Sequence, residues 1–94
     1  MTYIIYPKNN HIKVTNRVTR EVQKADYYIH CDPKGKVVSL IFRDGHKITY
    51  SFKRFHEFTG ESYDAWLRKV ANSLKVYVPE QIAAKVVEVM EGSM

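Results

Sequence analysis

The sequence predicts an α+β fold in which an antiparallel sheet of four to five strands is followed by two C-terminal helices packed on one face. Three observations predict it. An Asp44-Gly45 dipeptide separates two β-rich runs, which is typical of a hairpin. Beyond Phe58 the apolar residues recur every three to four positions, which indicates a helix. Pro79 precedes a second stripe of helical spacing, so the helices follow the strands.

Two short strands are expected at the N-terminus. Residues 2–6 form the first, and Pro7 directly after them indicates an edge of the sheet, because proline cannot donate a ladder hydrogen bond. A turn at residues 8–10 leads to the second strand, residues 11–14, where apolar and polar side chains alternate. This alternation predicts a strand with one exposed face.

Residues 16–25 allow two interpretations. Val18, Val22 and Ala25 recur at helical spacing and would line one face of a short helix. The same segment is rich in Thr and Val, which favours a strand. This composition makes a strand the preferred interpretation.

A meander of three antiparallel strands follows, at residues 27–31, 36–43 and 46–53. The two-residue loop of its hairpin fixes the register, so Ile41 is expected opposite Ile48 and Val37 opposite Phe52. In the last strand Ile48, Tyr50 and Phe52 alternate with polar residues. We therefore expect these three side chains to face the core.

Two helices are expected to cover that face. The first spans residues 63–74, with Thr59 or Ser62 as its N-cap. The second begins at Pro79 and ends before Gly92, a residue suited to a C-terminal cap. The predicted core comprises Ile41, Ile48, Tyr50, Phe52, Trp66, Leu67, Val70, Leu74, Ile82 and Val86.

Length and composition indicate one globular domain over residues 1–94, since 94 residues with 45% hydrophobic and 27% charged side chains can build one modest core. The single cysteine, Cys31, permits no internal disulfide, which fits a reducing compartment such as the cytoplasm. No apolar run approaches the ~18 residues of a membrane span, and no signal peptide is recognised. We expect a cytoplasmic protein that does not engage a membrane.

Neither a metal site nor a catalytic motif is evident. His30 and Cys31 are neighbours in a predicted strand, so they point to opposite faces, and Cys31 is expected to be a small buried hydrophobe. No spacing typical of zinc ligands, phosphate-binding loops or hydrolase nucleophiles occurs. His46 beside Asp44 could exchange protons, but both belong to an exposed turn. We expect no enzymatic activity, no cofactor and no metal.

The charge is distributed unevenly. Residues 1–56 hold eleven Lys/Arg and four Asp/Glu, whereas residues 57–94 hold four and six. In the predicted hairpin Lys47 and Lys53 share the solvent face with hydroxyl side chains, which suits contact with phosphates. The residues predicted to bind nucleic acid are Lys36, Arg43, Lys47, Lys53 and Arg54. On this interpretation the protein is a nucleic-acid-associated regulator with a basic sheet surface.

An alternative rests on Val38, Leu40 and Phe42, which the predicted register places on the lysine side of the sheet. If no other strand covers them, they form an apolar patch with a basic rim, as protein-binding surfaces do. The protein would then be a binding module or inhibitor of the kind carried by phages and mobile elements, docking on an anionic protein surface.

The order of a three-strand meander and a helix resembles the plan of small DNA-reading domains, such as those of integrase arms and certain plant transcription factors. The likeness rests on the D-G-H-K hairpin and the W-L helix. It implies that an open sheet face enters the major groove. The chain has S-F-K-R-F-H-E-F where those domains carry a glycine-aromatic pattern, so the resemblance is one of architecture.

Overall fold

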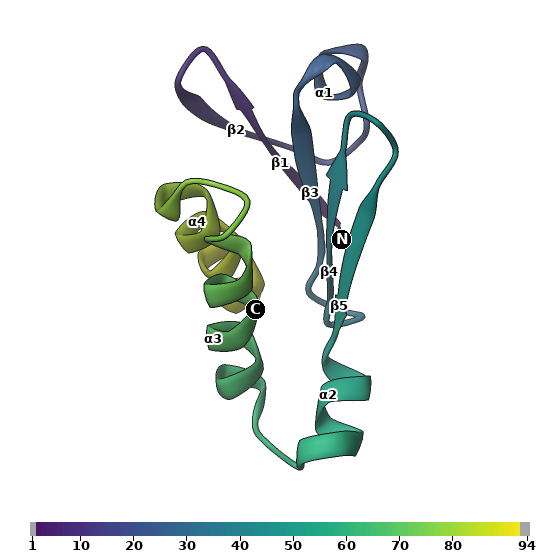
Figure 1. Ribbon diagram of the computed structural model, residues 1–94, viewed down its shortest axis with the longest axis vertical. Coiled ribbons are helices and arrows are strands. Elements are labelled where there is room, and N and C mark those ends of the chain that lie inside the picture. Colours follow the sequence, from purple (N-terminus) through teal and green to yellow (C-terminus); the bar gives the residue numbers. More distant parts are fainter. Residues whose placement is uncertain (1, 93–94) are drawn as a thin grey trace.

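The computed structural model describes residues 2–92 and confirms an α+β fold (Figure 1). Five strands pair antiparallel in one sheet, in the order β2-β1-β3-β4-β5. In chain order the elements are β1 (Tyr3–Lys8), β2 (His11–Thr15), α1 (Arg20–Lys24), β3 (Tyr27–Asp32), β4 (Val37–Phe42), β5 (Lys47–Ser51), α2 (Phe52–Thr59), α3 (Tyr63–Leu74) and α4 (Glu80–Glu91). The strand count is the upper end of the predicted range.

The two faces of the sheet are covered differently. α3 and α4 pack on one face and enclose the main core, in which Ile5, Ile29 and Leu40 are fully buried (Figure 1). α1 lies on the other face, where its Val22 packs with Ile4. We call the rest of this second face the open face; its side chains in β3, β4 and β5 are His30, Asp32, Val37, Ser39, Ile41, Lys47, Thr49 and Ser51.

The position of β1 differs from the expectation based on Pro7. β1 is not at an edge but lies between β2 and β3. Its pairing with β3 covers only Tyr3–Ile5, so at Pro7 no β3 residue requires an amide hydrogen. Asn9 and Asn10, with φ of 51° and 64°, turn the chain into β2. The short pairing with β3 therefore lets an interior strand contain a proline one residue before its end.

The preferred interpretation of residues 16–25 as a strand is wrong, since the segment contains α1. Thr19 caps this helix, because its hydroxyl accepts a hydrogen bond from the Val22 amide at 3.3 Å. Glu21 ties the helix to β1: its carboxylate accepts a hydrogen bond from the Tyr6 hydroxyl and forms an ion pair with Lys8. Capping and the burial of one valine outweigh the composition of the segment.

The hairpin forms, but its predicted register is wrong by one residue. The Phe42 amide donates to the His46 carbonyl at 2.8 Å, so the loop has three residues, and Gly45 takes a φ of 98°. Leu40 therefore pairs with Ile48, in place of the expected Ile41. A one-residue shift turns every side chain of β4 to the opposite face.

The last predicted strand was expected to reach residue 53, yet β5 ends at Ser51 and α2 begins with Phe52. Phe52 and Phe55 share one face of this short helix, so both can reach the core cluster. Gly60 ends the helix with a φ of 69°, and its amide donates to the His56 carbonyl at 2.8 Å. The residues expected to end the last strand therefore form a helix, which packs Phe52 and Phe55 against the core.

The helix prediction for residues 63–74 is confirmed, with Ser62 as the N-cap. α4 is confirmed with a shift of one residue, because Pro79 is its N-cap. Among predicted core residues, those buried are Trp66, Leu67, Val70, Leu74, Ile82 and Val86, and those half-buried against the core are Ile48, Tyr50 and Phe52. Ile41 was placed wrongly: it lies on the open face, and Val38 and Leu40 fill the core instead.

Candidate nucleic-acid interface

The five cations predicted to contact nucleic acid lie along one margin of the molecule, formed by the β4–β5 hairpin and α2. We call this margin the basic edge, and its residues are Lys36, Arg43, Lys47, Lys53 and Arg54. All five are exposed. Lys36 and Arg43 flank the six-residue strand β4, so at ~3.3 Å per residue the two ends of the basic edge are roughly 20 Å apart.

Three of these cations meet at the α2 end. The carbonyl of Lys36 accepts a hydrogen bond from the Phe52 amide at 3.1 Å, which places Lys36 beside the start of α2. Its Nζ lies 5.2 Å from the Phe52 ring centre, a distance at which a cation is attracted to an aromatic face. Lys53 and Arg54 follow in the first turn of α2, which has no acidic residue. Positive charge is therefore concentrated at this end.

The hairpin loop carries Arg43 together with one carboxylate, and Lys47 follows as the first residue of β5. The Arg43 amide donates to the Asp26 carbonyl at 3.0 Å, which ties the loop to the start of β3. The Asp44 carboxylate accepts a hydrogen bond from the His46 amide at 3.0 Å and lies 2.8 Å from its Nδ1. The amide and side-chain contacts from His46 lower the pKa of Asp44 below its usual value. Both side chains are exposed, so they stabilise a turn and enclose no substrate.

Between the two ends, the open face of β5 is polar. Lys47, Thr49 and Ser51 alternate there, as predicted from the sequence. Lys53, which was expected on the same strand face, lies instead in α2. The hydroxyl oxygens of Thr49 and Ser39 are 3.4 Å apart. β5 is also the outermost strand, so alternate backbone amides point away from the sheet. Hydroxyl and amide donors therefore accompany the cations along the basic edge.

The uneven charge of the sequence corresponds to the layers of the fold. The sheet, α1 and the first half of α2 come from residues 1–56, which hold eleven of the fifteen Lys/Arg. α3 and α4 come from the part of the chain in which acidic residues predominate. Residues 63–91, which form α3, α4 and their connection, hold four Lys/Arg and four Asp/Glu, so their formal charge is balanced. An anionic ligand is therefore attracted to the sheet layer more than to the helix layer.

The apolar patch proposed for protein binding does not exist in the predicted form. Val38 and Leu40 are 0% exposed, because the register places them under α3 and α4. Phe42 is half-buried, and its ring lies 5.8 Å from that of Tyr77 in an edge-to-face arrangement. These residues belong to the core and its margin.

Two residues near the basic edge were missed: Lys69, which only tertiary structure brings to α2, and Phe58, which belongs to α2 itself. Lys69 of α3 lies with its Nζ 5.7 Å from the ring centre of Phe55. Phe58 of α2 is 88% exposed. The F-x-x-F-x-x-F spacing of residues 52–58 was the available signal, since a helix cannot turn all three rings to the same core.

A pocket of about 300 Å³ opens between the end of β5, α2 and α3. Its lining residues are Tyr50, Ser51, Phe55, Trp66, Lys69, Val70 and Ser73. The Tyr50 and Ser73 hydroxyls are hydrogen-bonded at 2.6 Å. The pocket therefore combines aromatic walls with two fixed hydroxyls and one lysine.

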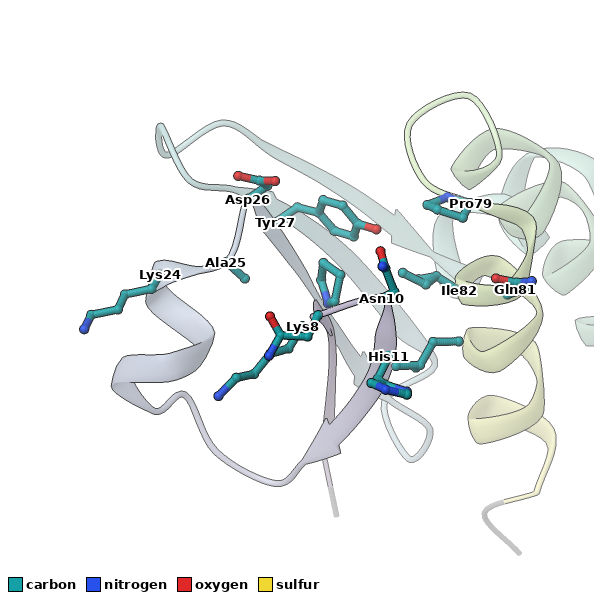
Figure 2. Close-up of a pocket in the computed structure, with 13 residues that line it drawn as sticks. Lys8, Asn10, His11, Lys24, Ala25, Asp26, Tyr27, Pro79, Gln81 and Ile82 are labelled. Carbon is teal, nitrogen blue, oxygen red and sulfur yellow. The ribbon is translucent and has the colours of Figure 1, made fainter.

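A second pocket, of about 490 Å³, lies beside the β1–β2 turn, toward the edge of the sheet opposite β5 (Figure 2). The β1–β2 turn, the end of α1, the start of β3 and the start of α4 line it. Figure 2 shows that Lys8 and Lys24 extend to one side, while Asp26 and His11 point in different directions. Its described lining contains no residue of the basic edge, and no hydrogen bond or ion pair joins its titratable side chains Lys8, His11, Lys24 and Asp26 to one another.

His30 and Cys31 point to opposite faces, as predicted: His30 belongs to the open face and Cys31 is fully buried in the core. Burial raises the pKa of the Cys31 thiol to about 12. Among residues 2–92, no group of three His, Cys, Asp or Glu side chains is placed to hold a metal ion. The structure also shows, over the same residues, no helix of the length and apolarity that a membrane crossing requires.

Comparison with known proteins adds no family to this description, because no family model, no curated protein and no solved structure matches the chain.

Proposed function

We propose that the protein is a nucleic-acid-binding regulator without an enzymatic activity of its own, and that its basic edge contacts backbone phosphates. The observation that carries the proposal is the basic edge itself: five exposed cations on the β4–β5 hairpin and the start of α2, whose two ends are roughly 20 Å apart. At ~3.4 Å per nucleotide, that length follows about six nucleotides of one strand. A cytoplasmic location is part of the same proposal.

The hydrogen-bond donors that lie between the cations of the basic edge favour a phosphate backbone as the ligand. Phosphates accept hydrogen bonds from hydroxyls and backbone amides as well as from Lys and Arg, and such contacts fix a protein on the backbone without reading sequence. Thr49, Ser51 and the outward amides of β5 supply those donors. The competing explanation is that lysines on an outermost strand only discourage pairing between sheets. The salt dependence of binding separates the two.

The test is charge reversal at both ends of the basic edge. Lys47→Glu with Lys53→Glu should leave the free energy of unfolding within about 0.5 kcal/mol of the parent, because both side chains are exposed. Affinity for DNA of arbitrary sequence should fall. The slope of log K against log[salt] should shrink by roughly 0.7–0.9 for each phosphate that the variant no longer neutralises. Fluorescence anisotropy at several salt concentrations measures both.

The matched control is Arg68→Glu with Lys75→Glu. It changes the net charge by the same amount on α3 and its C-terminus, in the helix layer. DNA affinity should change less in the control than in the variant of the basic edge. If the Lys47→Glu, Lys53→Glu variant binds DNA with the parent's affinity and salt slope, the basic edge does not bind phosphates.

A second candidate function, protein binding, is favoured by Phe58. Its ring is 88% exposed on the helix that carries Lys53 and Arg54, so an apolar residue with a basic rim exists at α2. On this proposal the protein is a module or inhibitor docking on an anionic protein surface. A partner purified with the chain from its native host should then be lost with Phe58→Ser and retained in the Lys47→Glu variant.

A further inference from the structure

The pocket between β5, α2 and α3 has the properties of a site for a flat aromatic ligand. Phe55 and Tyr50 are half-buried, and Trp66 forms part of the wall. Its volume of about 300 Å³ is at the lower end of the ~300–1,000 Å³ usual for ligand sites, so one ring system is the size that it accommodates. Aromatic side chains stack with any nucleobase, because every base has a π-face.

Two hydroxyl groups in the lining of the pocket can hydrogen-bond the edge of such a ring. The Tyr50 and Ser73 hydroxyls share a hydrogen bond of 2.6 Å, which fixes both in place. Each hydroxyl has one donor and two acceptor sites, so the pair retains capacity for a ligand after this bond is made. The pocket can therefore hydrogen-bond a base without selecting one base strictly.

One cation lines the pocket, and two more lie close to it in the chain. Lys69 lines the pocket, and no carboxylate of residues 2–92 forms an ion pair with it. Lys53 and Arg54 lie between two lining residues, Ser51 and Phe55, in the chain. A ligand with an aromatic ring and an attached phosphate matches this combination better than an uncharged apolar side chain does.

We propose that this pocket binds an unpaired nucleobase, with Lys69 contacting the adjacent phosphate, so that the ligand of the basic edge is single-stranded nucleic acid. This inference rests on the proposed function. A base inside a duplex is stacked and paired, so only a single strand or an extruded nucleotide can place its ring in this pocket against Phe55.

Trp66 gives a direct test, because it is the single tryptophan of the chain and lines the pocket. Titration with a short oligothymidylate should quench its fluorescence along the same isotherm that anisotropy of the labelled oligonucleotide reports. An abasic oligonucleotide of equal length should bind more weakly and leave the fluorescence unchanged, and so should a duplex. The same titration with oligouridylate distinguishes RNA from DNA as the preferred strand.

Variants of the pocket separate it from the basic edge. Phe55→Ala should lower single-strand affinity about tenfold and leave duplex affinity unchanged, while Phe55→Tyr should retain single-strand binding. Lys69→Gln, at an exposed position, should weaken single-strand binding without loss of stability. Circular dichroism of each variant shows whether α2 is retained, and Lys69→Gln keeps the proposal testable if Phe55→Ala unfolds the helix.

Three outcomes would overturn the inference. Binding that depends on the basic edge without quenching of Trp66 would show that the pocket stays empty, although the proposed function would stand. Equal affinity for the oligothymidylate and its abasic counterpart would likewise show that no base enters the pocket, and the proposed function would again stand. If no nucleic acid binds but a purified partner protein quenches Trp66, the pocket accepts a protein side chain, and both proposals are wrong.

Discussion

At the scale of single residues, burial decides which chemistry a side chain can carry. Cys31 is the only thiol of the chain, and it is 0% exposed between the sheet and the helices. Thiolates are the reactive form of cysteine, and burial raises the pKa of this thiol to about 12. Cys31 is therefore a packing residue, whereas the exposed lysines remain available for ligands.

Cys31 should be inert towards a thiol reagent at about pH 8 in the native protein and react fully in denaturant. The neutral thiol is favoured in the folded state, so its contribution to stability is complete below the ordinary pKa of 9.0 and is lost as the pH rises towards 12. The reaction is measured with a thiol reagent that releases a coloured group when it modifies the thiol, by the absorbance of that group. Rapid modification under native conditions would show that the thiol is accessible.

At the scale of elements, the hairpin shows what the sequence can and cannot determine. Asp44-Gly45 predicts the turn correctly, because Gly45 supplies the positive φ that the loop requires. Two-residue and three-residue loops both accommodate this dipeptide. β4 has apolar residues on both faces, so its pattern could not select the register, and α3 and α4 select it by burying Leu40.

Gly45→Ala should destabilise the protein by about 1 kcal/mol. The φ of Gly45 is 98°, which L side chains rarely adopt, and no atom lies within 4 Å of the added Cβ, so the cost is that of the backbone alone. Gly45→Asn should cost less, because Asn tolerates positive φ better than Ala does. Urea unfolding measures all three proteins. Equal stability of the parent and Gly45→Ala would mean that the loop readily adopts another conformation.

The helices differ in how far the sequence predicts them. α3 and α4 have long apolar stripes and a Ser62 or Pro79 at their N-termini, so both were predicted within one residue. α2 has only eight residues, and no side chain caps its N-terminus. It also follows a strand directly, so the period-two alternation of residues 48–52 predicted a strand that is too long. Short helices depend on tertiary contacts that local pattern does not contain.

At the scale of the whole molecule, charge and packing follow the same division into layers. The sequence predicted the excess of cations in residues 1–56, because charge counts need no structure, and the binding role of the basic edge stays a prediction. It could not predict that Lys69, from the acidic part of the chain, lies beside Phe55, or that Val38 and Leu40 are buried. The Lys69–Phe55 contact and the burial of Val38 and Leu40 depend on how α3 packs against the sheet and α2.

Trp66 lies where these elements meet. It is 2% exposed, and its ring is 5.8 Å from that of Phe52 and 5.5 Å from that of Tyr63. α2, α3 and the sheet therefore share contacts with one side chain. Removing it leaves a cavity that several elements would have to fill.

Trp66→Ala should cost about 3–5 kcal/mol, which is a large share of the ~5–15 kcal/mol that stabilises a small domain. Far-UV circular dichroism in urea should show a strongly lowered midpoint, with sheet and helix signals lost together because the core joins both layers. Val76→Ala is the matched control: this side chain is 77% exposed, so its loss should change stability by at most about 0.5 kcal/mol. An unchanged midpoint in Trp66→Ala would mean that α3 does not pack on the sheet through Trp66, and the pocket beside it would lose its wall.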